Sequence, residues 1–143
     1  MRKSFGFTLL EVMFVILILA ILASIAIPRL STTSDAAREK ADIASGREVK
    51  AALDRYQIEN GFYPKLKAVN GKITEESFIP AYIKKLDSTV TQQNAPEDKK
   101  GFGIVSTESN DKRIITIYLI DDEAEVEVYD KNLERILWSS KGE

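Results

Sequence analysis

The stretch FTLLEVMFVILILAILASIAI, residues 7–27, decides how this chain is organised. Only Thr8, Glu11 and Ser24 are polar in it. A helix rises about 1.5 Å per residue, so 21 residues span roughly 31 Å, the thickness of a bilayer's hydrocarbon core. Fourteen Leu, Ile, Val and Phe residues favour insertion by about 4–8 kcal/mol, and Glu11 opposes it by at most about 3 kcal/mol. The sequence therefore predicts a transmembrane helix that carries one carboxylate.

The six residues in front of this stretch, MRKSFG, contain Arg2 and Lys3 and no acid. Positive residues beside an apolar span stay in the cytoplasm, so we expect a cytoplasmic N-terminus and an exported remainder. A secretory signal has a shorter apolar region that is followed by a small-residue cleavage site. Here the small residue, Gly6, lies before the apolar region, and a charged helical sequence follows Pro28. The pattern differs from an ordinary secretory signal.

The string GFTLLEV, residues 6–12, lies between a basic leader and a long apolar helix. It resembles the class III leader junction of type IV pilins and type II secretion pseudopilins. The resemblance covers residues 1 to about 30 and extends more loosely to Gly61. It implies that a prepilin peptidase cleaves between Gly6 and Phe7, that Phe7 is N-methylated, and that the helices assemble into a filament core.

Glu11 has two interpretations. Its carboxylate could extend from the helix end to the lipid headgroups. Alternatively, cleavage frees an amine on Phe7, and the amine of a neighbouring subunit pairs with Glu11. A charge at bilayer depth is costly unless it is paired, so such a pair would set the axial register between subunits. We expect the second role, in filament assembly.

Pro28 follows the apolar stretch directly, and its nitrogen cannot donate to the carbonyl of Ser24. The helix either ends there or continues with a kink. Helical periodicity in residues 30–60 predicts that it continues, and Asn60-Gly61 predicts where it ends. In the resembling family a proline at this place lies where the helix can unwind in the filament, which would make Pro28 an assembly hinge.

Residues 30–60 form an amphipathic pattern in which Gly46 is an interior weakness of about 1 kcal/mol relative to alanine. The expected apolar stripe consists of Ala37, Ala41, Ala44, Val49, Ala52, Leu53 and Tyr56. The opposite face alternates in charge, as is typical of a solvated or subunit-facing surface. The stripe predicts that a small sheet packs on this half of the helix.

The remainder of the chain predicts a loop region over residues 61–100 and strands over residues 101–139. Within the loop region, residues 74–77 predict the cap of a short helix, and NGFYP at residues 60–64 resembles a turn of major pseudopilins and of disulfide-free pilins. Two-residue periodicity predicts strands at residues 103–106, 113–120, 124–129 and 135–138. We expect an α+β fold: a long N-terminal helix packed on a small antiparallel meander of three to four strands.

These observations divide the chain into three parts. Residues 1–6 are the expected leader peptide, residues 7–29 the transmembrane and assembly helix, and residues 30–143 one globular domain. The domain comprises the amphipathic helix, the loop region and the meander.

Composition narrows the possible functions. The chain has 20 basic and 22 acidic residues, which gives no electrostatic case for binding nucleic acid. It has no cysteine and no histidine, so it lacks disulfides and the commonest catalytic base. We expect neither an enzyme nor a cofactor. The acidic residues Asp121, Asp122 and Glu123 are weak calcium candidates, because their spacing matches no defined ligand pattern, and a solvated turn explains them better.

The resemblance implies a structural subunit of a type IV pilus-like filament. It would be made as a single-pass precursor in the inner membrane and would then enter an extracellular or periplasmic homo-oligomeric filament. A prepilin peptidase with N-methyltransferase activity and an assembly platform would be its partners. Two alternatives remain: the major pseudopilin of a type II secretion system, and a signal-anchored periplasmic binding domain.

Overall fold

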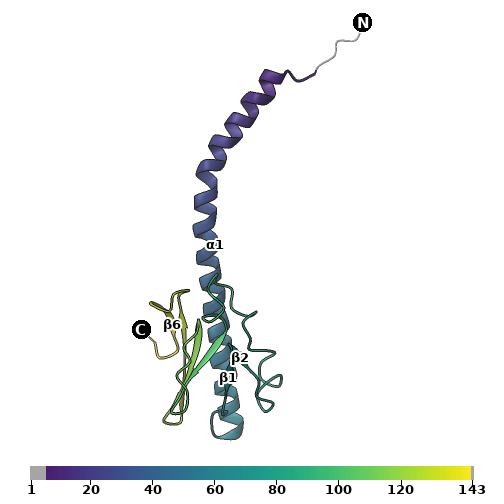
Figure 1. The fold of residues 1–143 in the computed structure, drawn as a ribbon. Coiled ribbons are helices and arrows are strands. Elements are labelled where there is room, and N and C mark those ends of the chain that lie inside the picture. The colour runs from purple at the N-terminus through teal and green to yellow at the C-terminus, as the bar shows by residue number, and fades with distance from the viewer. Residues whose placement is uncertain (1–5, 143) are drawn as a thin grey trace. The chain divides into compact units, whose positions relative to one another are not determined.

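The structure is a computed structural model, and it describes residues 6–142 (Figure 1). One helix and six strands follow along the chain: α1 (Leu9–Asn60), β1 (Ala68–Val69), β2 (Lys72–Ile73), β3 (Phe102–Val105), β4 (Ile115–Ile120), β5 (Glu123–Tyr129) and β6 (Ile136–Ser139). The chain divides into two compact units between Asp35 and Ala36. The predicted α+β class, with a long N-terminal helix and a four-stranded sheet, is confirmed.

The first unit contains the apolar half of α1. Every described residue from Gly6 to Asp35 is exposed, so the large apolar side chains of this unit have no cover among residues 6–142. By length and composition, α1 is apolar enough to cross a membrane. The hydroxyl of Ser24 donates to the carbonyl oxygen of Ile21 at 2.7 Å, which satisfies this polar group inside the helix.

Pro28 lies inside α1, and the helix continues through it. The alternative that the helix ends at Pro28 is therefore wrong. Just after the proline, the carbonyl oxygen of Arg29 accepts hydrogen bonds from the hydroxyls of Thr32 and Thr33, both at 2.9 Å. These hydrogen bonds from side-chain hydroxyls to a backbone carbonyl one turn earlier require helical geometry, so the helix is intact beyond Pro28.

In the second unit, α1 buries a stripe that differs from the predicted one. The buried residues are Asp42, Gly46, Val49, Ala52, Leu53 and Tyr56. Ala37 and Ala44, which were expected in the stripe, are exposed. The reason is close packing at Gly46: a Cβ added there would meet Cγ2 of Val128 at 2.5 Å and the ring of Trp138 at 3.5 Å. Glycine, and not alanine, faces the sheet at this point of the helix.

This packing predicts the effect of Gly46→Ala. Helix propensity favours alanine by about 1 kcal/mol, but overpacking against a stiff valine costs about 1–3 kcal/mol. We expect the substitution to lower the free energy of unfolding of the second unit. Chemical denaturation followed by circular dichroism measures this free energy. In a Val128→Ala background the same substitution should cost less, since the clashing methyl group is gone. A Gly46→Ala protein more stable than the wild type would contradict the packing argument.

The four-stranded sheet has the order β3-β4-β5-β6. β4 and β5 form an antiparallel hairpin in which Ile120 pairs with Glu123 across a two-residue turn. β5 and β6 are also antiparallel, with a register shift between Val128 and Tyr129. Alternate residues of β5, among them Val126, are fully buried against the core. These three strands form the predicted antiparallel arrangement.

β3 and β4 differ from the prediction because they pair in parallel, with Phe102 opposite Ile115. The connecting segment first turns back along β3: the N–H of Asp111 donates to the carbonyl oxygen of Ile104 at 3.1 Å. It then crosses over to start β4 in the same direction as β3. Gly103 permits this path, since a Cβ there would lie 2.1 Å from the carbonyl oxygen of Asp111. The fully antiparallel meander is therefore wrong for this one pair.

Two further differences lie in the loop region. β1 and β2 form a short hairpin around Asn70 and Gly71, whose φ angles of 51° and 80° are those of a type I′ turn. The short helix expected after residues 74–77 is absent from the described residues. Instead, the N–H groups of Phe78 and Ile79 both donate to the carbonyl oxygen of Glu75, which makes a tight turn.

Residues 87–100 form no strand, as predicted, but they are fixed to α1. The buried carboxylate of Asp42 accepts hydrogen bonds from the backbone N–H groups of Gln92, at 2.6 Å, and Gln93, at 3.1 Å. The side chain of Gln93 donates to the carbonyl oxygen of Tyr129 at 2.8 Å, which extends the connection to β5. Arg38 of α1 also donates to the carbonyl oxygen of Gln92 at 3.2 Å, so Asp42 and Arg38 together hold this loop against the helix.

Burial raises the pKa of Asp42, against the opposing effect of the two backbone donors. A carboxyl whose pKa is higher in the folded state contributes stability that is fully present below its ordinary pKa. That contribution is lost as the pH rises through the raised value. We therefore expect the stability difference between the wild type and Asp42→Asn to shrink as the pH rises above 3.8, the ordinary pKa of Asp. Denaturation curves across pH would check this, and a difference that grows with pH would contradict it.

Candidate processing and assembly site

The start of α1 is organised by a reciprocal pair of hydrogen bonds. The hydroxyl oxygen of Thr8 accepts from the backbone N–H of Glu11 at 3.1 Å, and the carboxylate of Glu11 accepts from the backbone N–H of Thr8 at 3.4 Å. This is a capping box, in which two donors at the helix start are satisfied at once. It defines the helix boundary immediately after Phe7.

Gly6 and Phe7 therefore lie outside the helix, and both are exposed. The side chain of Phe7 is 84% exposed. Among residues 6–142, nothing lies within 4 Å of a Cβ built on Gly6. No part of the described chain thus requires glycine at this position. The junction between Gly6 and Phe7 is a non-helical, accessible peptide bond, which is the geometry that a peptidase needs.

Glu11 is exposed on the first turn of α1, three residues after the helix cap. Within residues 6–142, its carboxylate has one hydrogen-bond donor, the backbone N–H of Thr8, at a long distance of 3.4 Å. Most of the acceptor capacity of the carboxylate is therefore unused among the described residues. Such a group can accept a stronger, charge-assisted bond from a cation outside the chain.

Arg2 and Lys3, the basic residues of the expected leader, lie outside the described residues. Pro28 lies in the same helix as Glu11, and the two are more than four turns apart in sequence. The structure therefore brings Gly6, Phe7 and Glu11 together at one helix start and does not bring Pro28 to that site.

Of the acidic calcium candidates, Asp121 and Asp122 form the turn between β4 and β5, and Glu123 is the first residue of β5. Asp121 and Asp122 have φ angles of 54° and 61°, as the two central residues of a type I′ turn require, and Asp is tolerated there. In the part of the chain that the structure describes, no group of three or more His, Cys, Asp or Glu residues is placed to hold a metal. The geometry accounts for Asp121 and Asp122 as turn formers, and the weak calcium candidacy of the three acids is untested.

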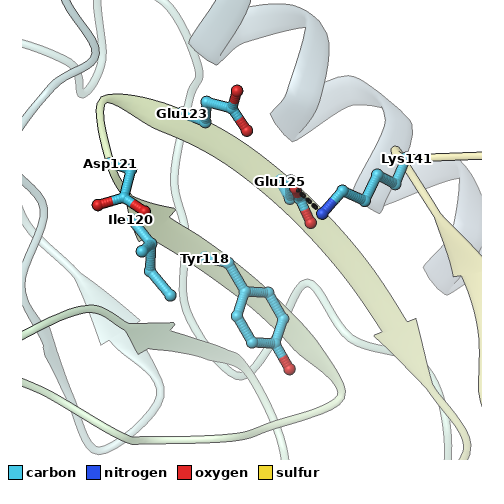
Figure 2. A pocket seen from close by; sticks show the side chains of 6 residues that line it. All are labelled: Tyr118, Ile120, Asp121, Glu123, Glu125 and Lys141. Atoms are coloured by element: carbon cyan, nitrogen blue, oxygen red, sulfur yellow. Dashed lines mark ion pairs between the residues drawn. The ribbon is translucent and has the colours of Figure 1, made fainter.

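A surface hollow of about 210 Å³ lies beside this turn, and Figure 2 shows the side chains that line it. The amine of Lys141 bonds the carboxylate of Glu125 at 2.8 Å, while Asp121 and Glu123 point away from each other. The ion pair engages the carboxylate of Glu125. The acidic side chains therefore do not converge on a common point.

Two functional features were missed in the sequence. The capping box had a readable signal, because Thr8 and Glu11 have the Thr-x-x-Glu spacing that precedes an apolar helix. The role of Asp42 in holding the loop had no readable signal in the sequence, since a single acid in an amphipathic helix normally faces water. Its partners, the backbone groups of Gln92 and Gln93, lie 50 and 51 residues further along the chain.

Comparison with known proteins agrees with this geometry. Residues 1–27 match the family described as the prokaryotic N-terminal methylation motif. A type II secretion system core protein G of Dickeya chrysanthemi is 33% identical over 97 residues, which cover 68% of this chain and 58% of that protein. The protein of the same name from Vibrio cholerae is 44% identical over 64 residues, 45% of this chain and 44% of that protein.

The core protein G of Escherichia coli is 32% identical over 93 residues, which cover 59% of this chain and 64% of that protein. The chain thus spans about half the length of the curated relatives that it matches. No solved structure matches it. The methylation motif, the relatives and the apolar helix that starts at the capped junction lead to one conclusion: the chain belongs to the family of type IV pilins and type II secretion pseudopilins.

Proposed function

We propose that this chain is a pseudopilin, a structural subunit of the filament of a type II secretion system. The observation that carries the proposal is the capped start of α1, which leaves Gly6-Phe7 exposed directly before a helix that is apolar on all sides. The similarity to proteins named type II secretion system core protein G favours secretion over a surface pilus. The precursor would cross the inner membrane once, with a cytoplasmic N-terminus, and the mature chain would enter a periplasmic filament.

Processing would take place at the exposed junction. A prepilin peptidase hydrolyses the peptide bond between Gly6 and Phe7, so the leader leaves with a carboxylate and Phe7 gains a free amine. A methyl group from the enzyme's methyl donor is then transferred to that amine. The capping box keeps the helix from extending back over the scissile bond, since Thr8 marks its start.

The exposed apolar surface of the first unit explains why assembly would follow. Lipid covers this surface in the membrane, but in water it would be insoluble unless other apolar surfaces covered it. Like helices of neighbouring subunits provide such a cover. The amine of Phe7 on one subunit would pair with Glu11 on the next, and Pro28 would let the helix adjust during packing. An assembly platform in the membrane is the expected partner for this step.

Deleting the gene from its own organism would test the proposal. We expect exported proteins to accumulate in the periplasm and wild-type complementation to restore their release. Normal secretion together with a loss of surface pili would contradict the secretion role and support the second candidate, a type IV pilus subunit. That candidate rests on the shared methylation motif.

The processing step has its own prediction. Gly6→Val should leave an unprocessed precursor in the membrane, because a branched side chain at the scissile bond prevents close approach of the peptidase. Gly6→Ala, which adds one methyl group in open space, is the matched control and should retain more processing. Immunoblots that separate precursor from mature chain measure the ratio. Complete cleavage of the Gly6→Val chain would contradict the assignment of the site.

A further inference from the structure

The chain contains two Asn-Gly dipeptides, Asn60-Gly61 and Asn70-Gly71. In such a pair the backbone nitrogen of the glycine can attack the side-chain carbonyl carbon of the asparagine, because glycine has no side chain to shield it. The attack requires a glycine N–H that is free to lose its proton and an asparagine amide that is free to turn. The two dipeptides differ in both respects.

Asn60 is held in an unreactive arrangement at the end of α1. The N–H of Gly61 donates to the carbonyl oxygen of Gln57 at 2.7 Å. The side-chain amide of Asn60 donates to the carbonyl oxygen of Tyr56 at 3.0 Å and to the hydroxyl of Tyr82 at 3.4 Å. Both the attacking group, the N–H of Gly61, and the group that it would attack, the side-chain amide of Asn60, are therefore held by hydrogen bonds.

Asn70 is in the opposite situation, at the tip of the β1–β2 hairpin. Its side chain is exposed, and neither its amide nor the N–H of Gly71 donates a hydrogen bond to any other of the residues 6–142. Gly71 is positioned through its carbonyl oxygen, which accepts from the N–H of Phe102 at 3.0 Å. Its nitrogen therefore remains unengaged.

A cation also lies beside this glycine. A guanidinium nitrogen of Arg113 is 3.2 Å from the position that a Cβ of Gly71 would occupy. Arg113 is itself fixed, since it donates to the carbonyl oxygens of Glu97, at 3.2 Å, and Lys100, at 3.0 Å. Its charge is compensated in part by the carboxylate of Asp111, which lies 3.2 Å from its Nε. These contacts fix the surroundings of Gly71 without occupying its N–H.

We infer that Asn70 is a site of spontaneous deamidation in the folded protein. The Gly71 nitrogen loses its proton and bonds to the side-chain carbonyl carbon of Asn70, and ammonia leaves, which closes a succinimide ring. Water then opens the ring to aspartate or to isoaspartate. Either product adds a negative charge to the hairpin tip, and isoaspartate also lengthens the backbone next to the Gly71–Phe102 hydrogen bond. The inference does not depend on the proposed function.

The two sites can be compared in one experiment on the full chain in detergent. Tryptic peptides separate them, because Asn60 lies in residues 56–65 and Asn70 lies in residues 68–72. After incubation at mildly alkaline pH, mass spectrometry measures the fraction of each peptide that has exchanged an amide for an acid. We expect the rate at Asn70 to exceed that at Asn60 by at least about tenfold, since a hydrogen bond must break before Gly61 reacts.

Incubation in guanidinium provides the control, because unfolding frees both dipeptides and should make their rates similar. Asn70→Gln should remove the signal from the second peptide without changing the first. Equal rates at the two sites in the folded protein would overturn the inference. So would modification of Asn70 only after unfolding.

Discussion

Glu11→Gln is expected to abolish filament assembly while membrane insertion and cleavage proceed normally. Glutamine also serves in a capping box, so the hydrogen bonds to Thr8 and the start of α1 should be retained. What the variant loses is the negative charge. At bilayer depth a charge pair is strongly favoured over an unpaired amine, so the amine of Phe7 on a neighbouring subunit would be left without its partner.

Thr8→Ala provides the complementary control, since it removes the hydroxyl of the cap and keeps the carboxylate. Its cost should be that of a lost helix cap, about 0.5–2 kcal/mol, and filaments should still form. Glu11→Ala and Glu11→Leu remove both functions and should fail as Glu11→Gln does. Shearing of filaments, followed by immunoblotting for precursor and mature chain, separates assembly from processing. Normal filaments from Glu11→Gln would show that the charge has no part in assembly.

Asp42→Ala is expected to cause a large loss of stability in the second unit. The carboxylate is fully buried and accepts from two backbone N–H groups, of Gln92 and Gln93. An unsatisfied buried donor costs about 1–3 kcal/mol; the N–H of Gln93 is buried and that of Gln92 is partly buried, so the substitution should lower the free energy of unfolding by at least about 1–3 kcal/mol. The segment around Gln92 should lose its two hydrogen bonds to the carboxylate and keep the exposed one from the Arg38 guanidinium to the Gln92 carbonyl oxygen.

Asp42→Asn should cost less than Asp42→Ala, because the amide oxygen can still accept one of the two hydrogen bonds. Glu48→Ala, at an exposed position of the same helix, is the control and should change stability by no more than about 0.5 kcal/mol. Chemical denaturation gives the free energies, and hydrogen exchange at Gln92 and Gln93 reports the attachment. Unchanged exchange at these two amides in Asp42→Ala would contradict the anchoring role.

Much of this fold follows from composition and short motifs. The apolar stretch of residues 7–27 could be identified because length and hydropathy alone determine whether a helix spans a bilayer. The helix end at Asn60 was predictable because a following glycine favours termination. β5 was predictable from alternation, since Ala124, Val126 and Val128 are buried and the residues between them are not. β4 was predictable from its nearly continuous apolar residues, and its first three residues are buried.

The remainder depends on contacts between distant residues. The parallel pairing of β3 and β4 requires a returning segment that passes close to Gly103, and no local pattern indicates such a path. The face of α1 that packs on the sheet is the one on which Gly46 meets Val128. The positions of the alanines in the sequence predicted a different face. The hairpin at Asn70-Gly71 differs from these two features, because the Asn-Gly dipeptide is a local sequence signal for a hairpin turn.

The mass of the mature protein tests the central claim most directly. Protein purified from the membrane of its own organism should begin at Phe7 and carry one methyl group on the Phe7 amine. Intact mass spectrometry with sequencing of the N-terminal peptide measures both features. A mature chain that retains residues 1–6 would contradict the account, because neither the free amine nor its pairing with Glu11 could then exist.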